Sequence, residues 1–363
     1  TAMFAAFTER WIRDAGPEGR DRRELLARLG LSVPATDDGD RILGVFDGSE
    51  RLVGTGSLVG ATIRGLGALP ECRDEGIAAR IVSALVTEAL RQGKTELYVF
   101  TKPETAPVFQ ALSFDLVART DDAALLEWSV AGRERGGLAP FLSALSDAAA
   151  GRPDGAGAAV VNANPFTLGH RYLLETAAAR APHLYVLVVE EDRSVFPFDL
   201  RLSLVQDGTA DLANVTVLRG GAYVISSRTF PSYFTRDDAV AQVHATLDAT
   251  IFAERIAPAL RVTERFVGTE PYCPVTRTYN EALKRVLPPR GIRVTEIPRV
   301  ERDGEAVSAS RVRRLIREGR LAETRALLPA TTYDALVAIE RKKESDPESA
   351  ALWKRIALGT GRH

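Results

Sequence analysis

The sequence predicts an α/β protein of two domains, a smaller α+β domain followed by a domain with a parallel sheet. The chain has 363 residues, which is more than one hydrophobic core usually holds. Glycines and loose charges interrupt the pattern between residues 129 and 157. After this interruption strands and helices alternate, and such alternation is typical of a parallel sheet covered by helices.

Composition excludes several classes of protein. Apolar residues make up 45% of the chain and charged residues 26%, which is ordinary for globular proteins. The net charge of −1 gives no general attraction to nucleic acid or to anionic membranes. The sequence has no apolar run of membrane-spanning length and no signal-peptide pattern. Its two cysteines, Cys72 and Cys273, form no C-x-x-C pair. We therefore expect a cytoplasmic protein with free thiols, no bound metal, and neither nucleic acid nor membrane as partner.

In residues 1–130 short apolar runs surround one long amphipathic helix. Apolar residues at helical spacing, from Ile77 to Ala89, predict this helix over 76–92. A shorter helix is predicted at 107–112. Strands are predicted at 42–46, 52–59, 63–69, 97–101, 114–118 and 124–128. These elements form the expected α+β domain.

The second domain is expected over residues 158–341, after a connecting segment at 131–157 that holds a helix near 138–149. Its predicted strands are 158–161, 184–189, 215–218, 266–268 and 292–297. Its predicted helices are 169–181, 198–209, 310–318, 321–327 and 333–341. Residues 342–363 are expected to form a charged tail that frays after a last short helix.

The first chemical motif lies where a predicted strand runs through a loop into a helix. It reads Asn162-Ala163-Asn164-Pro165-Phe166-Thr167-Leu168-Gly169-His170. Helix N-termini at the carboxyl ends of parallel strands point backbone N–H groups at anions. Gly169 would let the backbone approach a phosphate closely, and His170 could donate to an oxygen that gains charge during transfer. The alternative is a simple capped helix with an exposed histidine.

A second motif, at 307–313, begins a later helix. A serine there could cap the helix, and Arg313 carries a fork of donors suited to phosphate oxygens. In order, the two segments resemble the H/T-x-G-H and I-S-S/T-x-x-R signatures of the nucleotidyltransferase superfamily. They predict one nucleotide site with His170, Thr167 and Arg313 as its catalytic residues. The alternative for the second motif is a capped surface helix with solvated arginines.

A longer match makes the chain similar to the citrate lyase ligase family. The matching residues are 162–173, 190–194, 229–234, 268–271, 280 and 307–313. The resemblance implies a GNAT-like first domain and a Rossmann-like nucleotidylyltransferase domain. It also implies a ligase that uses ATP and Mg²⁺ to activate acetate as acetyl-adenylate. The acetyl group would pass to the thiol of the CoA-like prosthetic group on the citrate lyase acyl carrier protein, with pyrophosphate and AMP released.

The same resemblance assigns roles to individual residues. ATP would be held by Asn162, Asn164, Phe166, Thr167, Gly169, His170, Gly268, Glu270, Ser308, Ser310 and Arg313. The acid or the acceptor would meet Glu190, Asp192, Phe230 and Tyr233, for which a solvated loop and core aromatics are the alternatives. Arg201 could reach a phosphate or form a surface ion pair.

In the first domain a GNAT-type motif suggests a second ligand. Arg73, Gly76 and Ala78 fit the R-x-x-G-x-G/A loop of GNAT folds, and the N–H groups at this helix start would hold the pyrophosphate of the CoA-like arm. A structural remnant that binds nothing is the alternative.

Three functions remain open from the residues. The first is the acetate-activating ligase. The second is a nucleotide adenylyltransferase, or a ligase for a different small carboxylic acid or acceptor. The third is a CoA-dependent acetyltransferase. ATP–pyrophosphate exchange distinguishes them, because it would depend on the acid, on a nucleotide acceptor, or not occur.

Overall fold

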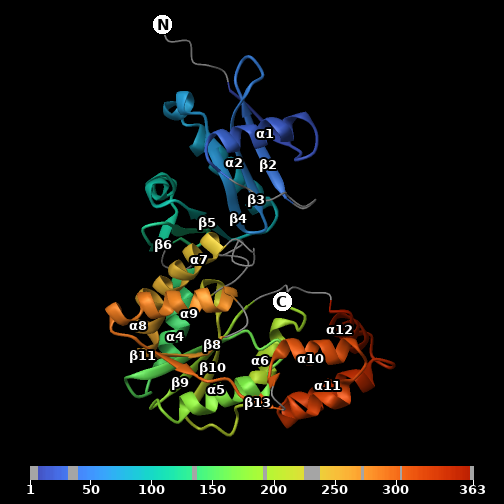
Figure 1. The fold of residues 1–363 in the computed structure, drawn as a ribbon. Helices are drawn as coiled ribbons and strands as arrows, with labels where there is room; N and C mark the ends of the chain where they lie inside the picture. The colour runs from blue at the N-terminus through green and yellow to red at the C-terminus, as the bar shows by residue number, and fades with distance from the viewer. Residues whose placement is uncertain are drawn as a thin grey trace. The chain divides into compact units, whose positions relative to one another are not determined.

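A computed structural model describes residues 7–31, 40–132, 137–190, 194–224, 238–270, 274–302 and 305–359. The chain divides into two compact units, and the boundary lies between Pro140 and Phe141. Figure 1 shows the ribbon of both units. No helix in the described part of the chain is long and apolar enough to span a membrane.

The first unit is built on a seven-stranded mixed sheet. Its strands are β1 (Thr8–Ile12), β2 (Arg41–Phe46), β3 (Leu52–Val59), β4 (Thr62–Ala68), β5 (Glu96–Thr101), β6 (Asp115–Arg119) and β7 (Ala124–Ser129). They are ordered β1-β2-β3-β4-β5-β7-β6, with β4 and β5 parallel and the other pairs antiparallel. The helical segments are α1 (Pro17–Arg28), η1 (Pro70–Glu75), α2 (Ile77–Arg91), η2 (Pro103–Thr105) and α3 (Ala106–Ala111). Because α2 connects the parallel pair, the unit has the α+β arrangement that the sequence predicts.

Helix α2 packs closely on β3 because β3 carries two glycines. A Cβ at Gly54 would lie 2.5 Å from Cγ2 of Ile77, and a Cβ at Gly56 would lie 2.6 Å from Cγ2 of Ile81. Both isoleucines are fully buried, and each such burial contributes about 1.5–3 kcal/mol. The predicted amphipathic helix is therefore a central part of this core.

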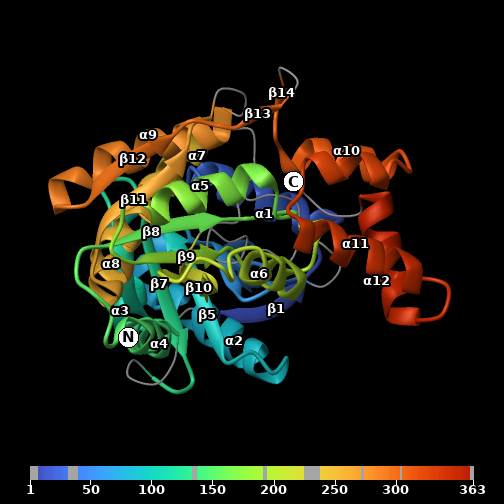
Figure 2. The same ribbon diagram turned by 90° about the horizontal axis from the view of Figure 1, so that it is seen from below.

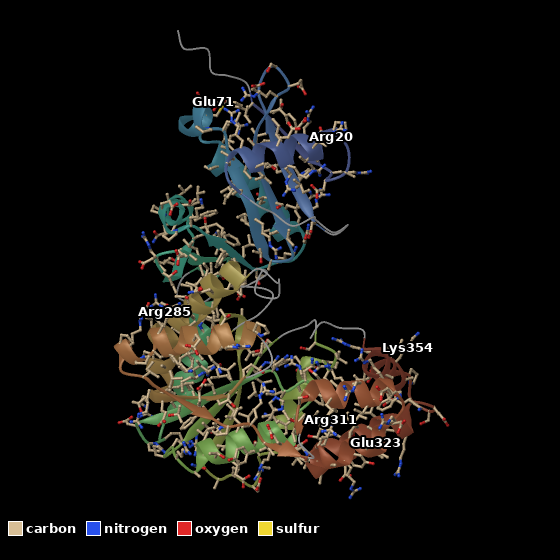
Figure 3. All side chains as sticks on the ribbon, in the orientation of Figure 1. Arg20, Glu71, Arg285, Arg311, Glu323 and Lys354 are labelled. Atoms are coloured by element: carbon tan, nitrogen blue, oxygen red, sulfur yellow. The ribbon has the colours of Figure 1, made fainter. Side chains whose placement is uncertain are left out.

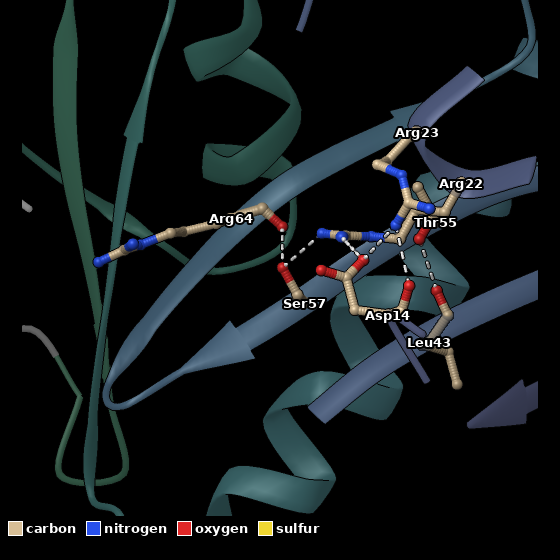
Figure 4. Close-up of polar contacts among 7 residues, drawn as sticks. All are labelled: Asp14, Arg22, Arg23, Leu43, Thr55, Ser57 and Arg64. Atoms are coloured by element: carbon tan, nitrogen blue, oxygen red, sulfur yellow. Dashed lines mark hydrogen bonds and ion pairs between the residues drawn. The ribbon is translucent and has the colours of Figure 1, made fainter. Parts of the chain in front are cut away.

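A buried arginine ties α1 to the sheet, as Figure 4 shows. Arg22 is 1% exposed. Its Nη1 donates to Oδ1 of Asp14 at 3.1 Å, and its Nη2 donates to the hydroxyl of Ser57 at 3.3 Å. Ser57 donates in turn to the carbonyl of Arg64 at 3.0 Å. The sequence pattern predicts neither α1 nor β1, because both segments are largely charged or exposed.

The second unit contains a five-stranded sheet in which every pair is parallel. Its strands are β8 (Ala156–Val161), β9 (Leu184–Val188), β10 (Val215–Arg219), β11 (Val262–Gly268) and β12 (Arg293–Ile297), ordered β10-β9-β8-β11-β12. The helices before and between them are α4 (Leu138–Ala149), α5 (Leu168–Ala178), α6 (Phe198–Asp207), α7 (Asp238–Ile251), α8 (Ala257–Leu260) and α9 (Pro274–Val286). The predicted alternation of strands and helices is confirmed.

The helices of this unit form distinct layers on the sheet. α5 and α6 share a core with β8 and β9, in which Leu174, Leu204 and Val186 are fully or almost fully buried. α7 lies beside α9 in both Figure 1 and Figure 2, and it continues through a π-helix, η4 (Phe252–Ile256), into α8. Neither α7 nor α9 is predicted from the sequence, because both lie in stretches where polar residues interrupt the apolar pattern.

A layer of helices follows the sheet of the second unit. It contains α10 (Ala309–Arg317), η6 (Leu321–Ala326), α11 (Ala330–Lys342) and α12 (Pro347–Leu358), after the short hairpin β13 (Glu301–Arg302) and β14 (Glu305–Ala306). Val312, Leu336 and Ile356 share one core, while Lys354 and Glu323 lie on its outer side (Figure 3). The sequence predicts a last short helix after residue 342, and α12 is this helix, which buries Ile356 to 1% exposure. The fraying expected beyond it falls on residues that lie outside the described part of the chain.

Candidate active site

The candidate site lies at the carboxyl ends of the parallel strands in the second unit. The chain runs from β8 to β9 and β10 on one side of the sheet and then returns to β11 on the other side of β8. The carboxyl ends of β8 and β11 therefore lie where the strand order reverses, which is where open α/β sheets bind ligands. The loops that follow these two strands carry the residues predicted from the sequence.

Thr167 and His170 form a reciprocal cap at the start of α5. The backbone N–H of Thr167 donates to Nδ1 of His170 at 3.1 Å, and the Thr167 hydroxyl lies 2.9 Å from the same nitrogen. The hydroxyl also accepts the backbone N–H of His170. A backbone N–H can only donate, so Nδ1 must accept and the ring proton of the neutral imidazole must be on Nε2. The cap therefore leaves Nε2 as a donor on the opposite edge of the ring.

The His170 imidazole is kept neutral by its surroundings. Burial lowers its pKa to about 4, and the positive charges of Arg299 and Arg313 act in the same direction. The ring of Phe166 stacks on the imidazole at a centroid distance of 5.9 Å. Phe166 has no exposed surface, so its side chain supports the imidazole from within the core. The assignment of Phe166 to ATP binding stays a prediction, which its buried side chain restricts to a contact through the backbone.

Gly169 brings the two predicted motifs together. A Cβ at this position would lie 2.8 Å from the backbone carbonyl oxygen of Val307, which is closer than such atoms can approach. The missing side chain therefore lets the start of α5 lie against the residue that precedes the cap of α10. The structure thus gives this glycine a packing reason, and its predicted role in phosphate binding stays a prediction.

The start of α10 supplies the remaining residues of the second motif. The Ser308 hydroxyl caps this helix by accepting the N–H of Arg311 at 3.2 Å. Arg313 is buried, and its Nη1 donates to the carbonyl of Asn164 at 2.5 Å while its Nη2 donates to the Ser310 hydroxyl at 3.1 Å. Arg313 thus joins α10 to the loop before α5, across 149 residues of sequence.

The loop between β8 and α5 is held by buried polar contacts. Oδ1 of Asn164 accepts the N–H of Phe196 at 2.9 Å, whereas its Nδ2 is buried and has no partner among the described residues. Nη1 of Arg201 donates to the carbonyl of Asn162 at 2.6 Å and to its Oδ1 at 3.0 Å. The same group donates to the carbonyl of Val189 at 2.9 Å. Arg201 is fully buried, so the suggested surface ion pair is wrong and the contacts seen are with the loop backbone.

The carboxyl ends of β11 and β12 contribute a group that the sequence analysis missed. Nε of Arg299 donates to the carbonyl of Thr269 at 2.7 Å, and Nη2 of Arg299 is paired with Oε2 of Glu270. Nδ2 of Asn280 donates to the carbonyl of Gly268 at 3.0 Å, and a Cβ at Gly268 would meet open space. The only sequence signal for Arg299 is its position two residues after a predicted strand.

The residues predicted to meet the acid or the acceptor are only partly described. Oε1 of Glu190 accepts from Nε of Arg219 at 3.0 Å, at the carboxyl ends of β9 and β10. Asp192, Phe230 and Tyr233 lie outside the described residues. No group of three or more His, Cys, Asp or Glu side chains that could hold a metal ion occurs in the described ranges.

In the first unit, the predicted pyrophosphate loop lies between η1 and α2. Gly76 has a φ of 68° and occupies the N-cap of α2, with Ala78 in the first helical turn. A left-handed residue at this position favours glycine. The side chain of Arg73 lies outside the described part of the structure. The backbone therefore has the helix start that the motif predicts.

The chain is similar in sequence to known proteins. Residues 156–336 match the family described as the citrate lyase ligase C-terminal domain. A [citrate [pro-3S]-lyase] ligase of Klebsiella pneumoniae is 40% identical over 308 residues, which cover 83% of this chain and 87% of that protein. A [citrate [pro-3S]-lyase] ligase of Escherichia coli strain K12 is 37% identical over 79% of this chain and 82% of that protein.

The first unit also has similar solved structures. An acetyltransferase of the GNAT family from Staphylococcus aureus Mu50 aligns with 34% of this chain and 99% of its own length, at 12% identity and a TM-score of 0.29. The alignments with the two ligases named above cover most of this chain and most of each ligase, at more than 35% identity. By its sequence, the chain belongs to the citrate lyase ligase family of enzymes.

Proposed function

We propose that the chain is an ATP-dependent acid–thiol ligase. The acid would react with ATP at the carboxyl ends of β8 and β11, between the starts of α5 and α10, a place called the crevice below. One observation carries the proposal: the N-termini of α5 and α10 meet through Gly169 and Val307. Two helix starts place backbone N–H groups and positive helix ends at one point, which suits a polyanion such as a triphosphate. The buried contact between Arg313 and the carbonyl of Asn164 fixes this convergence.

Two features of the crevice support a bound nucleotide. Nδ2 of Asn164 is a buried donor without a described partner, and such a group costs about 1–3 kcal/mol unless a ligand or water pairs with it. The open space beside Gly268 leaves room for a flat group against the backbone of β11. We assign the phosphates to Thr167, Gly169, His170, Ser308 and Ser310, and we assign the ribose and base to the side of Gly268.

His170 would act by hydrogen bonding rather than by proton transfer. A pKa of about 4 keeps the ring neutral at physiological pH, with Nε2–H as the donor. An oxygen of the acid attacks the α-phosphorus of ATP, the bond to the β-phosphate oxygen breaks, and pyrophosphate leaves. A donor aimed at the oxygens that gain charge in this step lowers the barrier because it binds the transition state more strongly than the ground state.

In the second step the acyl-adenylate would react with a thiol. The thiol sulfur attacks the acyl carbon and loses its proton, the bond to the phosphate oxygen breaks, and AMP leaves. We propose acetate as the acid and the CoA-like arm of the citrate lyase acyl carrier protein as the thiol donor. Glu190, with Asp192, Phe230 and Tyr233, is assigned to these substrates, and the start of α2 at Arg73, Gly76 and Ala78 is assigned to the arm. Mg²⁺ would enter on the triphosphate and offset its charge.

Acid-dependent ATP–pyrophosphate exchange tests the proposal. The protein is incubated with ATP, Mg²⁺ and labelled pyrophosphate, with acetate, other small acids, or a mononucleotide or phosphopantetheine acceptor. Label should enter ATP when acetate is present, and acetyl-AMP should be detected by mass. Exchange that needs a nucleotide acceptor instead of an acid, or no exchange with any addition, would contradict the proposal.

Substitutions of His170 test its role separately from its cap. In H170N the amide oxygen can still accept the Thr167 N–H, but the donor at the Nε2 position is lost. In H170Q a donor remains near that position. We expect exchange to fall by about 10²- to 10³-fold in H170N with little change in stability, and to fall less in H170Q. Equal exchange in H170N and the unsubstituted protein would show that the imidazole does not act on the reaction.

A further inference from the structure

Two Arg–Glu pairs bridge β11 and β12, one at each end of these strands. Arg293 and Glu264 lie 3.5 Å apart near the amino ends. Arg299 and Glu270 pair beyond the carboxyl ends. The first pair lies at the end of the strands opposite to the candidate site, whereas the second pair lies at the end that carries it. Only the second pair is therefore placed to act on a ligand bound there.

Arg299 is held in one orientation by its neighbours. Its backbone N–H donates to the Thr269 hydroxyl at 3.3 Å, and its Nε donates to the Thr269 carbonyl at 2.7 Å. Its Nη2 is paired with Glu270, whose carboxylate is only 6% exposed. The Arg299 side chain is 32% exposed, and Nη1 has no partner among the described residues. Nη1 is therefore the nitrogen of this guanidinium that a ligand could still pair with.

Backbone contacts link Arg299 to the start of α5. Val300, which follows Arg299, accepts the N–H of Val307 at 3.0 Å. The carbonyl of Val307 in turn lies against Gly169, one residue before His170. Consistent with this proximity, the charge of Arg299 lowers the pKa of His170 more than the charge of Arg313 does.

The other arginine of the crevice is less available to a ligand. Arg313 is 7% exposed, and both of its Nη atoms donate to groups of the protein, the carbonyl of Asn164 and the hydroxyl of Ser310. Arg313 thus serves mainly to hold the loop before α5. The guanidinium of Arg299 is therefore more available to an incoming anion than that of Arg313.

We propose that Arg299 binds an anionic oxygen of the substrates next to His170, and that Glu270 is the positioning residue that sets its guanidinium. The proposal rests on the proposed function, and it replaces the nucleotide contact assigned to Glu270 from the sequence. The anion is either a phosphate oxygen of ATP or the carboxylate of the acid. Both present the oxygen geometry that a guanidinium recognises.

The test compares R299M, R299K and E270Q with R293M, which makes the same substitution in the pair at the opposite end of the same strands. Exchange is measured with ATP and the acid varied separately, and the binding of ATP, pyrophosphate and acetate is measured by calorimetry. We expect R299M to raise KM for one substrate by about 10- to 100-fold, and R293M to leave KM unchanged. A rise in the KM for ATP with weaker pyrophosphate binding identifies a phosphate, and a rise in the KM for acetate identifies the carboxylate.

The role of Glu270 is tested by its dependence on Arg299. E270Q should raise the same KM by a smaller factor, and E270Q combined with R299M should be no worse than R299M alone. R299K should recover part of the affinity, which a purely structural defect would not allow. R299M with unchanged affinity for all three probes would overturn the proposal. Absence of acid-dependent exchange in the unsubstituted protein would instead refute the proposed function, while the binding measurements would still decide the role of Arg299.

Discussion

The contact between Gly169 and Val307 leads to a quantitative prediction. In G169A the new Cβ would lie 2.8 Å from a backbone oxygen, whereas ordinary contact begins at 3.4 Å. The start of α5 and the strand-like segment before α10 must therefore separate by about 0.6 Å, the difference between these two distances. Overpacking of this kind costs about 1–3 kcal/mol, and the better helix propensity of alanine returns at most about 1 kcal/mol.

We therefore expect G169A to lower the free energy of unfolding of the second unit by about 1–2 kcal/mol. The displacement also moves the Thr167–His170 cap relative to Ser308, and a misplacement approaching 1 Å can cost about 100-fold in rate. Exchange activity should fall by about 10- to 100-fold. The matched variant is G268A, whose Cβ would enter open space. It should keep its stability within about 0.5 kcal/mol, while its KM for ATP rises.

The assay needs a signal from the second unit alone, because a chain of two units need not unfold in one step. Trp353 is in the second unit, and Trp11 and Trp128 are in the first. In a background with W11F and W128F, urea unfolding followed by tryptophan fluorescence reports on the second unit. If G169A were as stable and as active as the background protein, the packing reason for this glycine would be refuted.

Three further predictions concern stability. Burial lowers the pKa values of His170 and His244 to about 4, so below pH 6.5 the unfolded chain binds protons that the folded chain does not. As the pH falls from about 6.5 to about 4, the free energy of unfolding should therefore decrease by up to about 1.4 kcal/mol per pH unit for each histidine. Urea midpoints measured across this pH range check the prediction. R201M leaves three backbone carbonyls without their donor and should lower the free energy of unfolding by about 3 kcal/mol or more. A smaller decrease in urea unfolding would contradict the role of Arg201 as a buried donor. I356A should cost about 2–5 kcal/mol, whereas L358A, at a residue 61% exposed, should stay within about 0.5 kcal/mol. Equal urea midpoints for these two variants would contradict the packing of α12 through Ile356.

Local patterns were sufficient to predict the strands of the two large sheets, except β1. The helix expected over 76–92 is α2, Ile77–Arg91, and the strand expected at 184–189 is β9, Leu184–Val188. Each owes its form to a hydrophobic period that neighbouring residues alone create. The order of the two motifs also indicated a shared site, because parallel strands bring their carboxyl ends to one edge of the sheet.

Arg201 shows a signal that was present but misread. Phe198, Arg201, Leu204 and Val205 are all buried on α6, and their spacing places them on one helical face. An arginine on an otherwise apolar face indicates a guanidinium that reaches buried acceptors. The two roles considered from the sequence, a phosphate contact and a surface ion pair, both assumed that the side chain faces solvent.

The remaining contacts of the site could not be predicted, and they share one physical cause. Arg201, Arg313 and Arg355 donate to backbone carbonyls of Asn162, Asn164 and Ser194, at 2.5 to 2.6 Å. Every residue carries a carbonyl oxygen, so no residue type marks where an arginine will find one. Such bonds exist only once the fold has brought distant segments together. The loop that joins β8 to α5 is therefore held by arginines of α6 and α10, while Arg355 of α12 holds the neighbouring residue Ser194, so the geometry of the crevice depends on all three helices.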